Sequence, residues 1–380
     1  MCARFNHIKL QIFDPEFGSG LTDLIISLDH LRKRNLQGST HPKIFFQLKR
    51  IFHILESIGS TRTEGNHTTI AEYIETKKKK KKNRSEKITE IANSEKAMKF
   101  IDENIEKTSI NRAFLCELHK QVVKDLKEEG SETPGCYRRK NLKIAMSKHL
   151  PPDYTQVDNY MSELISFINK EMAEKYDLLK TAIVHHRFAW IHPFDNGNGR
   201  TVRLLTYAML VKQGFTVNKG RILNPTAVFC NDRNQYYDAL ACADKGTKEG
   251  VLSWCEYVLN GLRSEIEKID KLLDYNFLKN VVLLPAVSLA RKRENITDRE
   301  RGVLKVAINK QVFKSSDIEH LFSGKVNTER SRVLRQLRES KMIIQLKKNS
   351  RKYVIRFDNN YLLRSIIELL KKNDFLPLID

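Results

Sequence analysis

Apolar residues return every three or four positions up to about Asp270, which is the spacing of amphipathic helices. Leu178–Trp190 is apolar almost throughout, so we predict a buried central helix there. The other predicted helices are Leu21–Leu28, Phe45–Ile58, Thr68–Thr76, Ile88–Ile105, Arg112–Glu128, Val157–Met172, Thr201–Lys212, Tyr236–Ala243 and Leu252–Asp270. The predicted fold class is therefore mainly α.

The helical spacing breaks off between Gly130 and Pro152. Pro134 and Gly135 mark a turn, and the prolines that close the segment disfavour a helix. Between them, Leu142–Met146 has the pattern of an extended chain. We predict a β-hairpin or extended flap within the otherwise helical domain.

A second unit follows a break in composition at Arg291–Asn295. Thr297 and Glu300 have the spacing of a helix capping box. The predicted elements are a helix from Thr297, helices over Ser316–Phe322 and Thr328–Ser340, and strands over Met342–Leu346 and Lys352–Phe357. Three helices followed by a β-hairpin is the order of a winged helix, so we predict a C-terminal winged helix-turn-helix domain.

The chain of 380 residues carries a net charge of +21, and six consecutive lysines, Lys77–Lys82, supply part of it. Like charges at this density repel one another, so we predict a solvated loop at the lysine run. The apolar runs are too short to cross a bilayer, the N-terminus lacks the apolar stretch of a secretory signal, and the six cysteines form no CxxC pair. We therefore expect a cytoplasmic protein without membrane contact, disulfide framework or zinc site.

The candidate chemistry lies between Ile191 and Arg203. Pro193 prevents simple continuation of the preceding helix, and the loop that follows contains Gly197 and Gly199. Glycines let backbone N–H groups approach an anion closely, and the next helix adds the positive end of its dipole. This loop is therefore suited to binding phosphate.

Three ionisable side chains flank this loop. Arg200 and Arg203 are three residues apart, so they lie on neighbouring positions of one helical face. His192 has an ordinary pKa of about 6.5, which suits a general base at neutral pH. The combination suggests attack by a hydroxyl group on a bound phosphate. Taken one at a time, the same residues would indicate a structural histidine, a glycine turn and a solvated helix face.

The segment His192–Arg203 resembles the signature of the Fic family, H-x-F-x-[D/E]-G-N-G-R-x-x-R. The resemblance implies a helical catalytic core over about residues 90–270 and transfer of AMP from ATP to a Ser, Thr or Tyr hydroxyl of a target protein. It implies that His192 is the general base and that Phe194 anchors the loop. It further implies that the phosphates are held by Gly197, Asn198, Gly199, Arg200 and, at the γ-phosphate, Arg203.

Asn196 departs from this signature, because the family has Asp or Glu at that position. In the family that acid binds Mg²⁺, and the neutral carbonyl of an asparagine is a weaker ligand for a hard cation. Either Asn196 or the neighbouring Asp195 is the candidate metal ligand. Gly199 matches the residue found in the family members that transfer nucleotides, whereas the phosphorylating Doc-type relatives commonly have lysine at this position. The resemblance therefore favours nucleotidyl transfer.

Two other regions support the resemblance. Tyr236 and Tyr237 lie where the family places residues around the adenine and ribose, although a pair of core tyrosines would fit the sequence equally well. Asn141–His149 resembles the flap on which a segment of the target protein docks as an added strand.

An inhibitory segment is also predicted, since Ser60–Gly65 resembles the family's inhibitory motif, [S/T]-x-x-x-E-[G/N]. Glu64 can pair with Arg203, which is then unable to bind the γ-phosphate. Without the Fic signature, the same residues would indicate a helix cap. We therefore predict an autoinhibited enzyme, which the substitution Glu64→Gly activates.

The predicted domains are an N-terminal helical segment with the inhibitory helix (1–85), a Fic catalytic domain (86–275), a linker (276–295) and a winged-helix domain (296–380). Basic residues mark the last domain, namely Arg330, Arg332, Arg335, Arg338, Lys347, Lys348, Arg351 and Lys352. They predict contact with DNA or, alternatively, with protein. The leading prediction is a protein adenylyltransferase that uses ATP and Mg²⁺. The rivals are a DNA-binding transcriptional regulator with a weakly active or inactive Fic core and an enzyme that removes AMP from modified targets. A homodimer is an open alternative to a monomer.

Overall fold

The structure is a computed structural model, and it describes residues 7–33, 39–79, 85–144, 149–215, 225–230, 232–322, 327–358 and 360–375. Helices dominate these residues and the strands among them are few and short, which confirms the predicted mainly α fold class. No helix within the described ranges has by itself the length and apolar character needed to cross a bilayer.

The chain forms two compact units. Unit 1 comprises Met1–Asn35, His53–Thr68 and Lys82–Ile266, and unit 2 comprises Leu36–Phe52, Thr69–Lys81 and Glu267–Asp380.

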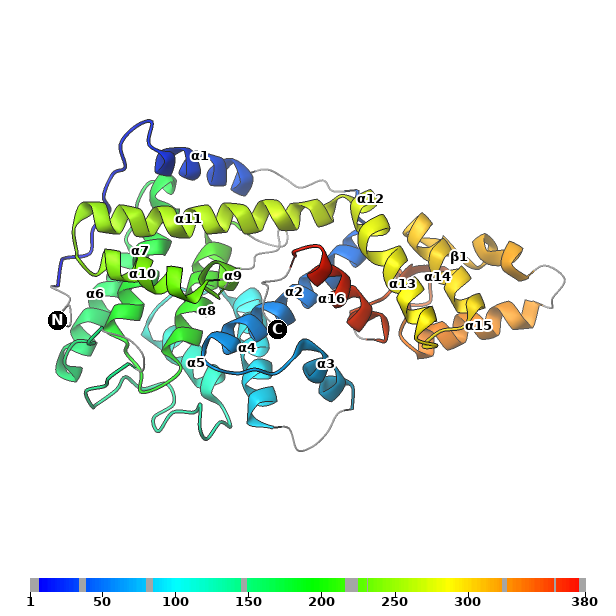
Figure 1. The fold of residues 1–380 in the computed structure, drawn as a ribbon, viewed down its shortest axis with the longest axis horizontal. Helices are drawn as coiled ribbons and strands as arrows, with labels where there is room; N and C mark the ends of the chain where they lie inside the picture. The colour runs from blue at the N-terminus through cyan, green and yellow to red at the C-terminus, as the bar shows by residue number, and fades with distance from the viewer. Residues whose placement is uncertain are drawn as a thin grey trace. The chain divides into compact units, whose positions relative to one another are not determined.

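Unit 1 is built around α7 (Asp177–Ile191) and α8 (Asn198–Lys212), which pack together in the green part of the ribbon (Figure 1). As predicted, α7 is buried along nearly its whole length. The other helices of this unit are α1 (Gly20–Lys33), the second half of α2 (Pro42–Thr63), α4 (Glu86–Asn104), α5 (Arg112–Val123), η1 (Tyr154–Gln156), α6 (Val157–Asn169), η2 (Glu174–Tyr176), α9 (Pro225–Cys230), α10 (Arg233–Ala243) and most of α11 (Lys248–Asp270).

Phe194, in the loop between α7 and α8, is fully enclosed, as expected for an anchor. Its ring stacks on that of His119 from α5, with the ring centroids 3.8 Å apart. His119 Nδ1 accepts the Gly135 N–H at 2.9 Å, and its Nε2 lies 3.1 Å from the Asn196 carbonyl oxygen. One histidine therefore ties α5, the turn at Gly135 and the loop before α8 to one another.

The predicted flap contains no strand among its described residues. Residues 141–144 and 149–152 are irregular, and Ala145–Lys148 lie outside the described residues. Asn141 donates to an Asp153 carboxylate oxygen at 2.8 Å, so the two ends of the segment are held together. The hairpin stays a prediction.

Unit 2 holds a three-stranded antiparallel sheet in the order β1-β3-β2. The strands are β1 (Phe313–Lys314), β2 (Ile343–Gln345) and β3 (Lys352–Ile355), of which the two-residue β1 was not predicted. The predicted capping box of Thr297 and Glu300 is present at the start of α14 (Asp298–Lys310). Other helices of this unit are the first half of α2, α3 (Ile70–Lys79), η4 (Lys271–Leu273), η6 (Ser315–Phe322), α15 (Asn327–Glu339) and α16 (Leu362–Lys372).

Two parts of unit 2 are more helical than the sequence suggested. Most of 276–295, predicted as a linker, belongs to α12 (Tyr275–Phe277), η5 (Leu278–Leu283) and α13 (Leu284–Lys292), and α13 packs against α14 and α16. The loop predicted at the lysine run is wrong for residues 77–79, because α3 continues to Lys79. Residues 80–82 lie outside the described ranges.

Candidate active site

His192 ends α7 in a left-handed backbone conformation, with φ 50° and ψ 61°. Its N–H closes the last helical turn on the Phe188 carbonyl at 3.0 Å, and Pro193 prevents a further turn. The side chain is partly buried. Burial lowers the pKa of His192 to about 4, although a hydrogen bond with the Ala189 backbone acts in the other direction. The imidazole is therefore neutral near pH 7, as a general base must be.

The loop after His192 is shaped by its own residues. Asn198 donates from Nδ2 to the Phe194 carbonyl at 2.8 Å, and its Oδ1 accepts the Phe194 N–H at 2.9 Å. Gly197 has φ 73°, and a Cβ there would come within 2.9 Å of Val123. Because α8 begins here, the N–H groups of its first turn have no partners within the helix. The groups suited to an anion are therefore backbone N–H groups, while the Asn198 side chain holds the loop in place.

Glu64 lies against the first turn of α8. A Cβ on Gly199 would collide with Glu64 Oε1, which shows how closely the carboxylate approaches that turn. Arg203 Nη2 donates to the same oxygen at 2.6 Å. Arg203 also donates from Nε to Ser60 Oγ at 2.9 Å and from Nη2 to the Ser60 carbonyl at 2.8 Å. Burial alone would raise the pKa of Glu64, but the Arg203 guanidinium outweighs it and holds that pKa below its usual value.

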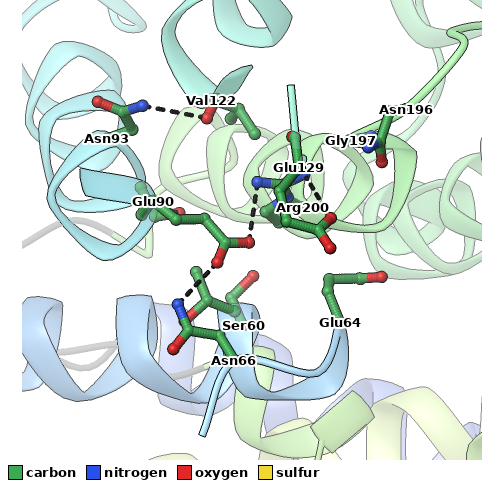
Figure 2. Close-up of polar contacts among 12 residues, drawn as sticks. Ser60, Glu64, Asn66, Glu90, Asn93, Val122, Glu129, Asn196, Gly197 and Arg200 are labelled. Atoms are coloured by element: carbon green, nitrogen blue, oxygen red, sulfur yellow. Dashed lines mark hydrogen bonds and ion pairs between the residues drawn. The ribbon is translucent and has the colours of Figure 1, made fainter. Parts of the chain in front are cut away.

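Arg200 faces a different carboxylate, that of Glu90 on α4 (Figure 2). Arg200 Nη1 lies 2.9 Å from Glu90 Oε1, and Arg200 Nη2 donates to the Glu129 carbonyl at 2.9 Å. Asn66 donates to the second Glu90 oxygen at 2.7 Å. Burial outweighs the effect of Arg200 and raises the pKa of Glu90. Both terminal nitrogens of Arg200 thus contact protein, and its predicted contact with phosphate gains no support from this arrangement.

Residues 109–210 match the model of the Fic/DOC family, and they include every residue from His192 to Arg203. The chain contains a Fic domain. It is 29% identical over 200 residues to protein adenylyltransferase Fic of Drosophila grimshawi, covering 51% of this chain and 38% of that relative. Over 228 residues it is 29% identical to the protein of the same name from Culex quinquefasciatus, covering 57% and 42%. The chain thus spans about two fifths of the length of these curated relatives.

Solved structures share the fold of the Fic domain. A Fic family protein from Desulfovibrio desulfuricans G20 superposes with a TM-score of 0.54 at 17% identity, over 91% of this chain and 98% of that one. A Fic domain containing signaling protein from Bacteroides thetaiotaomicron VPI-5482 gives 0.52 at 18% identity, over 67% and 97%. At these identities the likeness concerns the fold, and it confirms the predicted Fic-type helical core.

The predicted metal ligands of the Fic domain are engaged by backbone N–H groups and a serine hydroxyl of the same domain. Asn196 Oδ1 accepts the Gly197 N–H at 2.6 Å. The two Asp195 oxygens accept from Ser131 Oγ at 2.6 Å and from the Glu132 N–H at 2.8 Å. Within the described ranges, no group of three or more His, Cys, Asp or Glu side chains could hold a metal ion. These residues do not fit a magnesium site, so magnesium stays a prediction of the resemblance.

The two tyrosines predicted near the nucleotide differ in their surroundings. Tyr236 is enclosed, its hydroxyl lies 3.0 Å from His185 Nε2, and burial raises its pKa. Tyr237 is 40% exposed, with the Arg233 guanidinium over its ring. Tyr236 therefore fits the alternative of a core residue, whereas Tyr237 is open to a ligand.

Three residues that shape the site were not predicted: Glu90, Asn66 and Arg138, which binds the backbone at the end of α7. Glu90 left a signal in the sequence, because it shares a helix face with the buried Ala97 and Ile101. An acid on an apolar stripe is seldom buried without a partner. Asn66 and Arg138 left no such signal, since neither interrupts an apolar stripe of a predicted helix.

Proposed function

We propose that this chain is an autoinhibited protein adenylyltransferase, which transfers AMP from ATP to a Ser, Thr or Tyr hydroxyl of a target protein or of itself. The main support is the neutral His192 imidazole beside a glycine loop at the N-terminus of α8, with Arg203 on the same helix. The names of the relatives, protein adenylyltransferase Fic, point to the same reaction.

His192 is proposed to act as the general base. One ring nitrogen bonds the Ala189 backbone, which leaves the other to accept a proton. As the target hydroxyl loses its proton to His192, its oxygen attacks the α-phosphorus of ATP. The bond between that phosphorus and its bridging oxygen breaks, and pyrophosphate leaves. Backbone N–H groups of residues 197–199 and the α8 dipole stabilise the charge that develops on the phosphate oxygens.

Glu64 is proposed to keep this reaction slow. Its carboxylate lies at the positive end of α8 and pairs with Arg203. A γ-phosphate at Arg203 would meet a like charge at close range, so ATP would bind weakly or in an unproductive position. Displacement of Glu64 would free Arg203 for the phosphate.

Intact-mass measurement after incubation with ATP tests both the reaction and its inhibition. We expect Glu64→Gly to gain the mass of AMP and the wild type to gain little. Adding His192→Ala should lower transfer by about 10²- to 10⁴-fold, the usual contribution of a general base. Parallel incubations with CTP, GTP and UTP identify the preferred nucleotide. If Glu64→Gly gains no nucleotide mass from any of the four, the transferase function is wrong.

A second function, contact of unit 2 with DNA, is supported by a groove of about 420 Å³ beside β2. The cations that line it are Lys43, Arg338, Lys347, Lys348 and Arg356. On α15, Arg332 and Arg335 are exposed while Val333 and Leu337 are buried. This pattern suits a winged helix with α15 as its recognition helix. The test is a gel shift with duplex DNA, in which an affinity that does not fall with added salt argues against phosphate contact.

A further inference from the structure

A buried arginine, Arg138, joins the end of α7 to both ends of the flap segment (141–149). Arg138 is 3% exposed. Nε donates to the His192 carbonyl at 2.9 Å, Nη1 to the Lys140 carbonyl at 3.0 Å, and Nη2 to the Pro152 carbonyl at 2.6 Å. One planar group therefore contacts the candidate base, the residue before the flap segment and a residue just after it.

The hydrogen bonds of this side chain with described residues all end on backbone carbonyls, including a longer one to Ile191 at 3.4 Å. Burial lowers the pKa of Arg138, and Asp153 acts in the opposite direction. A buried cation is costly unless its donors are satisfied, and the C-terminal carbonyls of a helix are a favourable place for it. The position of Arg138 is therefore determined by the carbonyls that it joins.

His192 needs such support, because its left-handed backbone conformation is disfavoured for a residue with a Cβ. Arg138 holds the chain at this residue and at the next one. Its side chain bonds the His192 carbonyl, and its backbone N–H donates to the Pro193 carbonyl at 2.8 Å. This backbone conformation sets the direction of the Cα–Cβ bond that carries the imidazole.

We propose that Arg138 is a positioning residue for AMP transfer, which holds the described residues 140–144 and 149–152 in place relative to His192 and so aligns the target hydroxyl with the imidazole. This inference rests on the proposed transferase function. None of the side-chain hydrogen bonds of Arg138 to described residues reaches Arg203 or residues 197–199. ATP binding should therefore not depend on Arg138, whereas alignment of the hydroxyl with the base should.

The test compares Arg138→Met with Arg139→Met, which changes the exposed arginine next to it, both in the Glu64→Gly variant. We expect the ATP affinity measured by calorimetry to change less than about threefold in either variant, because neither arginine aligns the nucleotide. Self-transfer of AMP at saturating ATP should fall at least about tenfold in Arg138→Met and stay within about twofold in Arg139→Met. Arg138→Lys, which keeps the charge but not the fork of donors, should lie between them.

Loss of ATP affinity in step with transfer, or loss of neither, would overturn the proposal. If Arg138→Met does not fold, Arg138→Lys carries the same test, with reduced transfer and unchanged ATP affinity as the expected result. Hydrogen exchange separates this inference from the transferase function, since it needs no activity. Amides of residues 139–144, 149, 150 and 153 should exchange faster in Arg138→Met than in Arg139→Met even if Glu64→Gly proves inactive, and equal exchange would contradict the proposed attachment.

Discussion

Two arginines of α8, Arg200 and Arg203, each face a carboxylate, but the two pairs differ in their access to water. The Glu64 side chain is 32% exposed and pairs with Arg203. The side chains of Glu90 and Arg200 are 2% and 1% exposed. The first pair therefore borders the solvent on one side, whereas the second is enclosed by protein.

This difference separates a contact that can open from one that cannot. When an exposed carboxylate leaves its partner, water solvates it and the loss of free energy is small. When a buried pair is broken, a charge stays without compensation in the interior. We infer that the Glu64–Arg203 pair suits a reversible inhibitory contact, and that the Glu90–Arg200 pair anchors α8 to α4.

The largest expected effect is on stability. Glu90→Gln should lower the free energy of unfolding by about 3 kcal/mol, because Arg200 loses its buried counter-charge and keeps only the more distant and more exposed Glu129 carboxylate at 3.7 Å. Glu64→Gln should cost at most about 1 kcal/mol, since water reaches that pair and Arg203 keeps its bonds to Ser60. Urea unfolding followed by tryptophan fluorescence measures both values.

That signal reports on the relevant part of the chain, because the chain has two tryptophans, Trp190 and Trp254, and both lie in unit 1. A matched change elsewhere in the unit, Glu163→Gln at the partly exposed partner of His7, serves as the control. Equal losses for Glu64→Gln and Glu90→Gln would contradict the distinction between the two pairs.

The second effect is on activity, where the change at Glu64 should have a larger effect than the change at Glu90. Glu64→Gly should raise self-transfer of AMP at least about tenfold, which lies within the usual range of coupling between a regulatory contact and a ligand. Glu90→Gln should leave it at or below the wild-type level, because Arg200 stays tied to the Glu129 carbonyl. Incorporation of label from α-labelled ATP, divided by the amount of folded protein, measures both. Activation by Glu90→Gln would mean that Arg200 is restrained in the same way as Arg203.

Sequence patterns predicted the first pair and not the second, for a physical reason. Ser60, Glu64 and Arg203 belong to short motifs, so their contact could be expected from the two motifs alone. The Glu90–Arg200 contact depends on how α4 packs against α8, which no local spacing specifies.

The same reasoning explains the outcome for the fold. Long amphipathic helices were predicted well, because burial of one face leaves a regular spacing of apolar residues. The two-residue β1 was missed because it exists only through pairing with β3. The conformation of His192 depends equally on distant residues, since Arg138 binds its carbonyl from outside the motif.

A smaller effect is expected at Asn66, which lies between the two pairs and is 4% exposed. It donates to the Lys87 carbonyl at 2.8 Å and to Glu90 at 2.7 Å. Asn66→Ala should lower the free energy of unfolding by about 2 kcal/mol, because it removes these two bonds and the one that the Thr68 N–H donates to Asn66 Oδ1, each with a net value of about 0.5 to 1.5 kcal/mol. In the double variant Asn66→Ala/Glu64→Gln, the two losses of unfolding free energy should add to within about 0.5 kcal/mol if the two pairs act independently. A larger coupling would show that release of Glu64 also loosens Glu90.

The smallest expected effect is that of pH on the inhibition. Arg203 holds the pKa of Glu64 below its ordinary value of 4.5, so the stabilising pair is complete above that pH and is lost only as the pH falls through the lowered value. The ratio of transfer by Glu64→Gly to transfer by the wild type should therefore stay constant between about pH 5.5 and 7, because His192, whose pKa burial lowers to about 4 while Glu64 acts in the opposite direction, stays neutral over this range in both proteins. The range ends below the pKa of Glu56, a residue of α2, which ends just before Glu64, and burial raises the pKa of Glu56 to about 8. A ratio that falls as the solution is acidified within this range would mean that Glu64 is protonated there, and then the solvent-bordered pair would be weaker than its geometry indicates.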